Sequence, residues 1–185
     1  MDIKKILDFE VSIKKRLLLL VLFIGVLTTT DLIVKEIVCR NIKNNKEITV
    51  IKNFWYFGYV ENDDIGLSAL RGVTQGLDKN VKRIIMICLQ SFGCIVALIF
   101  YYYLKKIKYF IPLILIICGG LGNLIDRIIR GYVVDYIMWF FNFIPLRFFN
   151  PFPIFNLADV YAFIGGFLLF MMLLIFHKEV KDNKF

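Results

Sequence analysis

The chain has 185 residues, and 59% of them are hydrophobic. Its mean hydropathy is +0.70, and one domain of this length cannot bury so much apolar surface in a soluble core. The net charge of +8 could suggest nucleic acid, but the basic residues flank apolar segments and form no groove interleaved with aromatics. The composition therefore argues against a nucleic-acid-binding module and predicts a membrane protein, with anionic lipid head groups as partners.

Four apolar segments approach the length of about 20 residues that crosses the hydrocarbon of a bilayer. They cover about residues 17–34, 84–104, 109–125 and 160–176. We predict an all-α membrane protein in which residues 1–185 form a single domain of four transmembrane helices. The outer segments are then about 35–83 and 126–159. No Ala-x-Ala-like cleavage site precedes Asp31, so the first segment is interpreted as an uncleaved helix.

Basic residues mark one side of this arrangement. They precede the first helix, join the second to the third and follow the fourth, as Lys4, Lys5, Lys14, Lys15 and Arg16, then Lys105, Lys106 and Lys108, then Lys178, Lys181 and Lys184. Short loops rich in lysine and arginine remain in the cytoplasm. We therefore expect both termini to be cytoplasmic and the two longer connections to lie outside.

The two outer segments differ in composition. The first contains Ile48–Ile51 and Phe54–Phe57, whose alternation and β-branching predict short strands in a small β-rich segment. The aromatics around Trp55 suit either an anchor at the membrane surface or a shelter that keeps water from a site. In the second segment, Pro145, Pro151 and Pro153 prevent regular helix, which predicts an ordered loop over the site.

Several hydrolytic chemistries conflict with the residues available. The only histidine, His177, falls at the cytoplasmic end of the last helix, which excludes a Ser-His-Asp triad or an HExxH zinc site on the outer face. A dyad of Ser68 and Lys35 is a weak alternative, because nothing nearby marks Ser68 as a nucleophile. Carboxylates are abundant at the outer boundary, as Asp31, Asp63, Asp64, Asp126, Asp135 and Asp159. Acid–base chemistry, with no metal or cofactor, is therefore the economical hypothesis.

The aspartates differ in their surroundings. Asn123, Asp126 and Arg130 share one helix face by spacing, so a structural ion pair is the favoured interpretation of Asp126, while Arg127 points elsewhere and can bind a neighbour. Asp135 lies among apolar residues with no base nearby, which favours a raised pKa and a usable proton.

Asn156 and Asp159 repeat the three-residue spacing at the start of the fourth helix. Asparagine and aspartate are preferred N-cap residues, so helix capping is an alternative interpretation for either of them.

Two sequence boxes resemble a known family. They are Gly119–Arg127 followed by Gly131–Asp135, and Phe155–Asp159, which reads Phe-Asn-Leu-Ala-Asp. Together they resemble the signatures of bacterial lipoprotein signal peptidases, which are aspartyl membrane peptidases also called signal peptidase II. Asp31 and Lys35 resemble a pair that the family carries at the end of its first helix.

One further box departs from the family pattern. The family usually has Asn-x-Gly-Ala-Ala-Phe-Ser where this chain has Asn62–Ser68. Asn62 and Ser68 fit this pattern, but Asp64 replaces a glycine. The charges of Asp63 and Asp64 could therefore change specificity or inhibitor contacts.

The resemblance implies a function and a set of site residues. It implies catalysis by Asp135 and Asp159, supported by Asn123, Asp126, Arg127, Asn156, Asn62, Asp31 and Lys35. The implied substrate is a diacylglyceryl-modified prolipoprotein, cleaved on the N-terminal side of its lipidated cysteine. A monomer in the bacterial inner membrane, with an extracytoplasmic site that globomycin inhibits, is the corresponding expectation.

Another class of protein would explain some of these features. In a small transporter or proton-coupled channel, Asp31, Asp126, Asp135 and Asp159 would form a relay. Their clustering on one side argues against this, as does the second segment, which has no charge between Ile84 and Leu104. The glycines Gly119, Gly120 and Gly122 suit either close helix packing or close approach of a substrate backbone.

Overall fold

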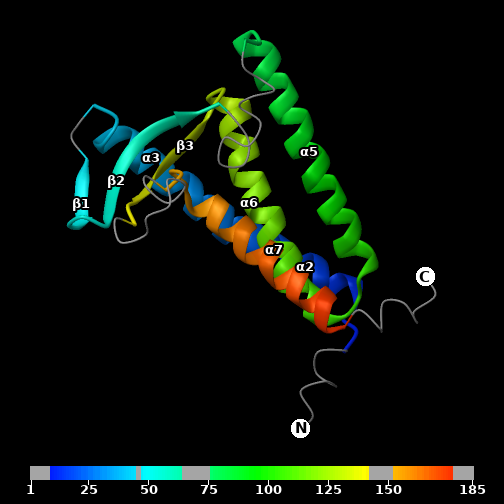
Figure 1. Cartoon of the computed structure of the whole chain (residues 1–185). Helices are drawn as coiled ribbons and strands as arrows, with labels where there is room; N and C mark the ends of the chain where they lie inside the picture. The colour runs from blue at the N-terminus through cyan, green and yellow to red at the C-terminus, as the bar shows by residue number, and fades with distance from the viewer. Residues whose placement is uncertain (1–8, 45–46, 64–75, 142–151, 177–185) are drawn as a thin grey trace.

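A computed structural model describes residues 9–44, 47–63, 76–141 and 152–176 of the chain (Figure 1). In these ranges four helical stretches, Ile13–Asn41, Lys79–Tyr103, Ile107–Ile129 and Leu157–Ile175, are long and apolar enough to cross a membrane. They run alternately up and down. Figure 1 shows a small sheet at one end of the bundle, and the start of the first helix and the end of the last at the other. This arrangement confirms the predicted fold class.

The first membrane helix is built in three parts. It comprises α2 (Ile13–Phe23), a π-helical turn η1 (Ile24–Thr28) and α3 (Thr29–Asn41). It extends well beyond the apolar segment 17–34 of the sequence. The extension is possible because Asp31 and Lys35 are fully buried inside the protein and do not face lipid. Thr28, in the π-helical turn, donates its hydroxyl hydrogen to the carbonyl of Cys118 at 3.4 Å.

The other helices also extend beyond their apolar segments, and polar residues cap the N-terminal ends of α5 and α7. Helix α5 spans Lys79–Tyr103, and the carboxylate of Asp78 accepts hydrogen bonds from the backbone N–H groups of Asn80 and Val81. A short 3-10 turn, η2 (Ile107–Tyr109), leads into α6 (Phe110–Ile129). Helix α7 spans Leu157–Ile175, with Asn156 as its N-cap.

Helix α6 is the centre of the bundle. In its most apolar stretch 61% of the residues are buried, against at most 22% in the other three helices. Glycines let its neighbours approach. A Cβ atom at Gly119 would collide with the carbonyl oxygen of Ala158 in α7, and one at Gly122 would lie 2.6 Å from Oδ2 of Asp31. These contacts support the packing interpretation of the glycines.

The sheet has three antiparallel strands in the order β1–β2–β3. They are β1 (Ile48–Ile51), β2 (Trp55–Asn62) and β3 (Val133–Trp139). β1 matches its predicted range, and β2 extends further than the predicted Phe54–Phe57. β3 occupies part of the segment expected to be an ordered loop. It follows α6 through a turn at Gly131, whose φ of +90° favours glycine. Asp64, Ser68, Pro145, Pro151 and His177 lie outside the described residues.

Aromatic side chains pack within the sheet and between β3 and Phe155, two residues before α7. Trp139 packs edge-to-face on Phe155 with ring centroids 4.8 Å apart, and Trp55 packs in the same way on Phe57 at 5.5 Å. Phe155 belongs to a buried cluster with Val38 of α3 and Tyr136 of β3, and the other three aromatics pack against this cluster. The cluster fixes β3 against the start of α7, so it sets the position of Asp135 relative to Asp159.

Candidate active site

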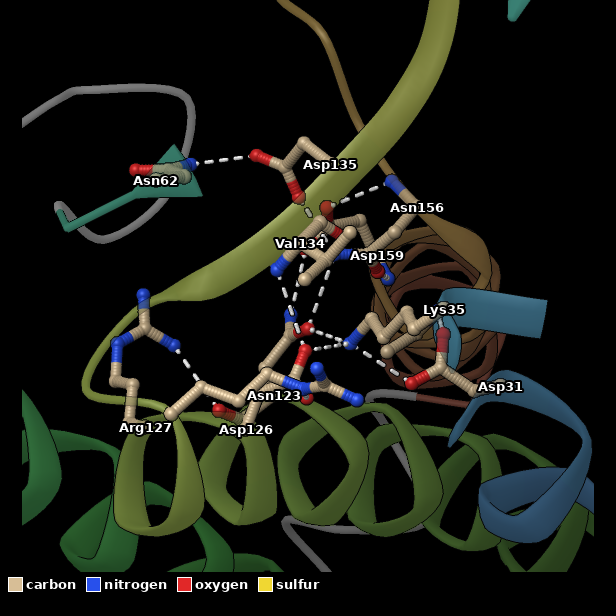
Figure 2. Close-up of polar contacts among 12 residues, drawn as sticks. Asp31, Lys35, Asn62, Asn123, Asp126, Arg127, Val134, Asp135, Asn156 and Asp159 are labelled. Carbon is tan, nitrogen blue, oxygen red and sulfur yellow. Dashed lines mark hydrogen bonds and ion pairs between the residues drawn. The ribbon is translucent and has the colours of Figure 1, made fainter. Parts of the chain in front are cut away.

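Asp135 lies in the middle of β3 and is only 2% exposed. Its Oδ2 accepts a hydrogen bond from Nδ2 of Asn62 at 2.7 Å, and its Oδ1 accepts one from Nδ2 of Asn156 at 2.7 Å (Figure 2). Asn62 can reach it because Val60 pairs with Asp135 and Asn62 pairs with Val133, which places Asn62 and Asp135 on one face of the sheet.

The environment of Asp135 favours its protonated form. Burial, together with the nearby charge of Asp159, raises the pKa of this carboxyl to about 7, although the hydrogen bonds from Asn62 and Asn156 act in the opposite direction. A carboxyl group with such a pKa can hold or release a proton near neutral pH, as acid–base catalysis requires.

Asp159 occupies the first turn of α7 within a capping box. Its backbone N–H donates to Oδ1 of Asn156 at 3.0 Å, and its Oδ2 accepts from the backbone N–H of Asn156 at 3.1 Å. Its Oδ1 accepts a third hydrogen bond, from Nδ2 of Asn123 at 2.8 Å. The capping alternative for Asn156 is therefore correct. The same side chain also contacts Asp135, so capping the helix and holding the two aspartates are one arrangement.

The hydrogen bonds of Asn123 can run in only one direction. Lys35 has donors and no acceptor, and its Nζ lies 2.8 Å from Oδ1 of Asn123. The same oxygen accepts from Nδ2 of Asn156 at 3.1 Å. The Nδ2 of Asn123 must therefore face Asp159. In consequence, each of the four carboxylate oxygens of Asp135 and Asp159 accepts an N–H group from a fixed donor.

Lys35 is the fully buried centre of a charged cluster. Its Nζ lies 2.8 Å from Oδ2 of Asp31 and 3.1 Å from Oδ2 of Asp126. Asp31 in turn accepts the backbone N–H of Ala158 at Oδ1, 3.0 Å away, so it helps to cap α7 from a different helix. Buried charges of this kind require such partners, because their desolvation is costly.

Asp126 connects three elements. Its Oδ1 pairs with Nε of Arg130 at 3.1 Å, and its Oδ2 accepts the backbone N–H of Val134 at 3.2 Å. Arg130 continues to Oε2 of Glu36 in α3 at 2.7 Å. The ion pair predicted from the spacing of Asp126 and Arg130 is present. Because Val134 precedes Asp135, this carboxylate also sets the path of β3 at the site.

Arg127 points away from this face of α6, as its spacing predicts. Its Nη1 donates to Oε1 of Gln90 in α5 at 2.6 Å. Gln90 was not singled out from the sequence, although an amide side chain within the apolar stretch from Ile84 to Leu104 was a signal that could have been noticed.

Two other predicted features can be placed. Asp63 lies beside the site and pairs with Lys82 of α5 at 3.1 Å, while its neighbour Asp64 is not described. Lys35 is occupied by two carboxylates, which disfavours the Ser-Lys alternative. Within the described part of the chain, no group of three or more histidine, cysteine, aspartate and glutamate side chains is arranged to hold a metal ion.

The sequence comparisons agree on one family. The model of the family described as Signal peptidase (SPase) II matches residues 23–175. The chain belongs to the signal peptidase II family. A lipoprotein signal peptidase of Clostridium tetani is 33% identical over 159 residues, which is 84% of this chain and 91% of that one. One of Lactococcus lactis subsp. lactis is 34% identical over 171 residues, 91% and 99% of the two chains.

Solved structures share the fold of this signal peptidase II. A bacterial membrane enzyme determined by the in meso method at 2.3 Å has a TM-score of 0.70 and 24% identity, covering 95% of this chain and 97% of that chain. A second, at 1.9 Å, has a TM-score of 0.68 and 25% identity, covering 90% and 97%. The family model and the named relatives confirm the resemblance seen in the two sequence boxes, and the protein is a membrane protease of this family.

Proposed function

We propose that this signal peptidase II is an aspartyl endopeptidase that removes the signal peptide from diacylglyceryl-modified prolipoproteins. It cleaves on the N-terminal side of the lipidated cysteine, with Asp135 and Asp159 as catalytic residues. The names of its relatives, lipoprotein signal peptidases, support the substrate class. The observation that carries the chemistry is the position of Asn156, which binds Asp135 through its side chain at 2.7 Å and Asp159 through its backbone N–H at 3.1 Å.

Two carboxyl groups held by one residue favour a shared proton. Ionising both would place like charges together in a buried site, so one group stays protonated while the other is a base. The ionised member accepts a proton from water, which attacks the scissile carbonyl carbon. The protonated member donates a hydrogen bond to the carbonyl oxygen as it becomes negative. Proton transfer to the leaving nitrogen then breaks the peptide bond.

The surrounding donors orient both acids for this chemistry. Asn62, Asn123 and Asn156 each donate to a carboxylate oxygen from outside the pair. The remaining lone pairs of these oxygens are therefore available to water and substrate. Asp31, Lys35 and Asp126 fix the asparagines and the start of α7, and Arg127 adds a positive charge beside them.

The proposed orientation in the membrane follows from charge and shape. The basic residues Lys14, Lys15 and Arg16 stand at the start of α2, at the end of the bundle opposite the sheet (Figure 1). This supports cytoplasmic termini and an extracytoplasmic site in the bacterial inner membrane. Large apolar side chains such as Phe92 and Phe163 are exposed on the helices and would face lipid. The acyl chains of a substrate can remain there while its peptide reaches the polar groups.

Substrate and lipids are the partners that this function needs. A monomer contains every residue of the proposed site, so we expect one chain to cleave by itself. Inhibition by globomycin is a further expectation. Asp63 and Asp64 stand where the family pattern differs, so their replacement should alter specificity or inhibitor affinity and leave the chemistry intact.

The decisive experiment measures cleavage of a diacylglyceryl-modified prolipoprotein in lipid by the wild type, Asp135→Asn and Asp159→Asn. The mass of the product should show a new N-terminus at the lipidated cysteine, formed by the wild type alone. Asp78→Asn makes the same chemical change at the N-cap of α5, where asparagine caps equally well, and should retain activity. Substantial cleavage by either folded site variant would refute the dyad. Failure of a folded wild type to cleave would refute the substrate.

A further inference from the structure

Helix α5 contributes none of the catalytic groups discussed so far, yet in the middle of its apolar stretch the polar side chain of Gln90 contacts α6. Gln90 sits among Ile87, Leu89 and Phe92 and is half-buried. Its Oε1 accepts from Nη1 of Arg127 at 2.6 Å, and its Nε2 donates to the backbone carbonyl of Gly120 at 3.0 Å. Both ends of the amide are therefore satisfied, which is unusual for a chance polar residue in an apolar helix.

The orientation of Gln90 is determined by its partners. Arginine can only donate, so the atom of Gln90 that faces Arg127 must be oxygen. A backbone carbonyl can only accept, so the atom that faces Gly120 must be nitrogen. Gln90 therefore binds the side chain of Arg127 and, two turns earlier, the backbone of α6, which leaves the amide little freedom to rotate.

A glycine makes this reach possible. A Cβ atom at Gly120 would lie 2.5 Å from Sγ of Cys94, one turn after Gln90 in α5. The missing side chain allows α5 to approach α6, and this approach brings Gln90 to the carbonyl of Gly120. The close contact of the helices and the hydrogen bonds of Gln90 are thus parts of one arrangement.

Arg127 is buried one turn after Asn123, which donates a hydrogen bond to Asp159. Its Nη1 is 3.4 Å from the backbone carbonyl of Asn123, the residue whose side chain donates to Asp159. Its charge interacts with the carboxylate of Asp159. No direct ion pair joins the two among the salt bridges between residues that the structure describes. Gln90 holds the guanidinium on the α5 side of α6.

We propose that Gln90 is a positioning residue for the cleavage reaction: it keeps the guanidinium of Arg127 at a fixed place beside the aspartate pair. This inference rests on the proposed function of Asp135 and Asp159. Without Gln90, the guanidinium loses its 2.6 Å acceptor on α5. It would then move to other acceptors, and a direct bond to Asp159 would compete with the sharing of a proton.

The test compares cleavage kinetics of Gln90→Leu, Gln90→Glu and Ser91→Ala with those of the wild type in lipid. Gln90→Leu should lower kcat about tenfold with a much smaller change in KM, since small displacements of a catalytic group cost rate. Gln90→Glu still accepts from Arg127, so it should recover most of kcat although it cannot donate to Gly120. Ser91, which makes no side-chain hydrogen bond within the described residues, provides the matched control on the same helix.

A second comparison shows through which residue Gln90 acts. In an Arg127→Gln background, Gln90→Leu should change kcat by no more than about twofold, because contacting residues that act as a unit are not additive. A Gln90→Leu protein that melts earlier but has wild-type kcat would overturn the inference and leave only a packing role. Equal losses in both backgrounds would also overturn it. Activity of Asp159→Asn, by contrast, would refute the proposed function itself.

Discussion

The two ends of the helix bundle are held together by different physics. At the sheet end, Lys35, Asn123 and Asn156 make hydrogen bonds whose donors and acceptors cannot be exchanged. At the other end, Phe110, Leu113 and their neighbours form an apolar core. The buried Arg16 there donates from Nη2 to the carbonyl of Tyr102 at 2.8 Å and packs over the rings of Tyr101 and Phe110. Stability at the sheet end therefore depends on the direction of hydrogen bonds, and stability at the other end depends on the volume of the packed side chains.

The largest effect should come from removing the cation at the centre of the sheet end. Lys35→Met leaves Asp31 and Asp126 facing each other without their shared partner. Loss of one member of a buried pair costs about 3–5 kcal/mol, so the melting temperature should fall sharply and cleavage should be lost. Adding Asp31→Asn removes one uncompensated charge and should restore part of the melting temperature. If Lys35→Met alone melts like the wild type, the charged cluster does not stabilise the sheet end and the contrast between the two ends fails.

Substitutions of Asn156 can separate its role in capping α7 from its role in positioning Asp135. Asn156→Ala removes both the cap of α7 and the bond to Asp135, which should cost about 1 kcal/mol of stability. The same change should lower kcat by about 100-fold through the misplaced acid. Asn156→Ser keeps a capping oxygen but loses the amide donors, so it should recover the melting temperature and not kcat. Recovery of both would show that capping alone matters.

A smaller effect should appear in the pH dependence of stability. Burial raises the pKa of Asp135 from 3.8 to about 7, so between these values the folded protein binds more protons than the unfolded chain. Stability from this group therefore falls as the pH rises from about 4 to about 7. Relative to the wild type, Asp135→Asn should gain melting temperature over that range. A constant difference between the two melting curves at every pH would argue against a raised pKa.

The smallest effect belongs to the apolar end. Leu113 is buried at 1% exposure, and Leu113→Met changes its shape while keeping its volume. Such a swap should cost less than about 1.5 kcal/mol and leave cleavage unchanged. Thermal unfolding and the cleavage assay measure both quantities. A loss of activity without unfolding would mean that this core communicates with the site.

Much of this molecule could be predicted from local sequence patterns. Apolar length identified the four helices, helical spacing identified the ion pair of Asp126 with Arg130, and the family resemblance pointed to the pair of Asp31 with Lys35. Helix ends were placed too early or too late because capping residues and buried charges do not resemble membrane segments. The sequence left Asn156 as either a helix cap or a site residue. In the structure it is both, because it caps α7 and also donates to Asp135.

The remaining features depend on partners distant in sequence. Val133–Trp139 has little alternation because both faces of its first five residues are buried, and it becomes a strand by pairing with β2. Asn62 meets Asp135, and Gln90 meets Arg127, across separations that no local periodicity encodes. The sequence indicated the chemistry of the site residues, but only the structure shows which of them are in contact.

The π-helical turn at Ile24–Thr28 gives the first membrane helix a phase shift. A π-turn holds one residue more than an α-turn, and one residue of α-helix corresponds to about 100° of rotation. The π-turn therefore rotates the helix face that carries the charged residues after it relative to the face that carries the leucines before it. Deleting one residue there would hardly change the hydropathy of the helix, yet it would swing Asp31 and Lys35 away from α6. The number of residues in this helix is therefore constrained, in addition to its hydrophobicity.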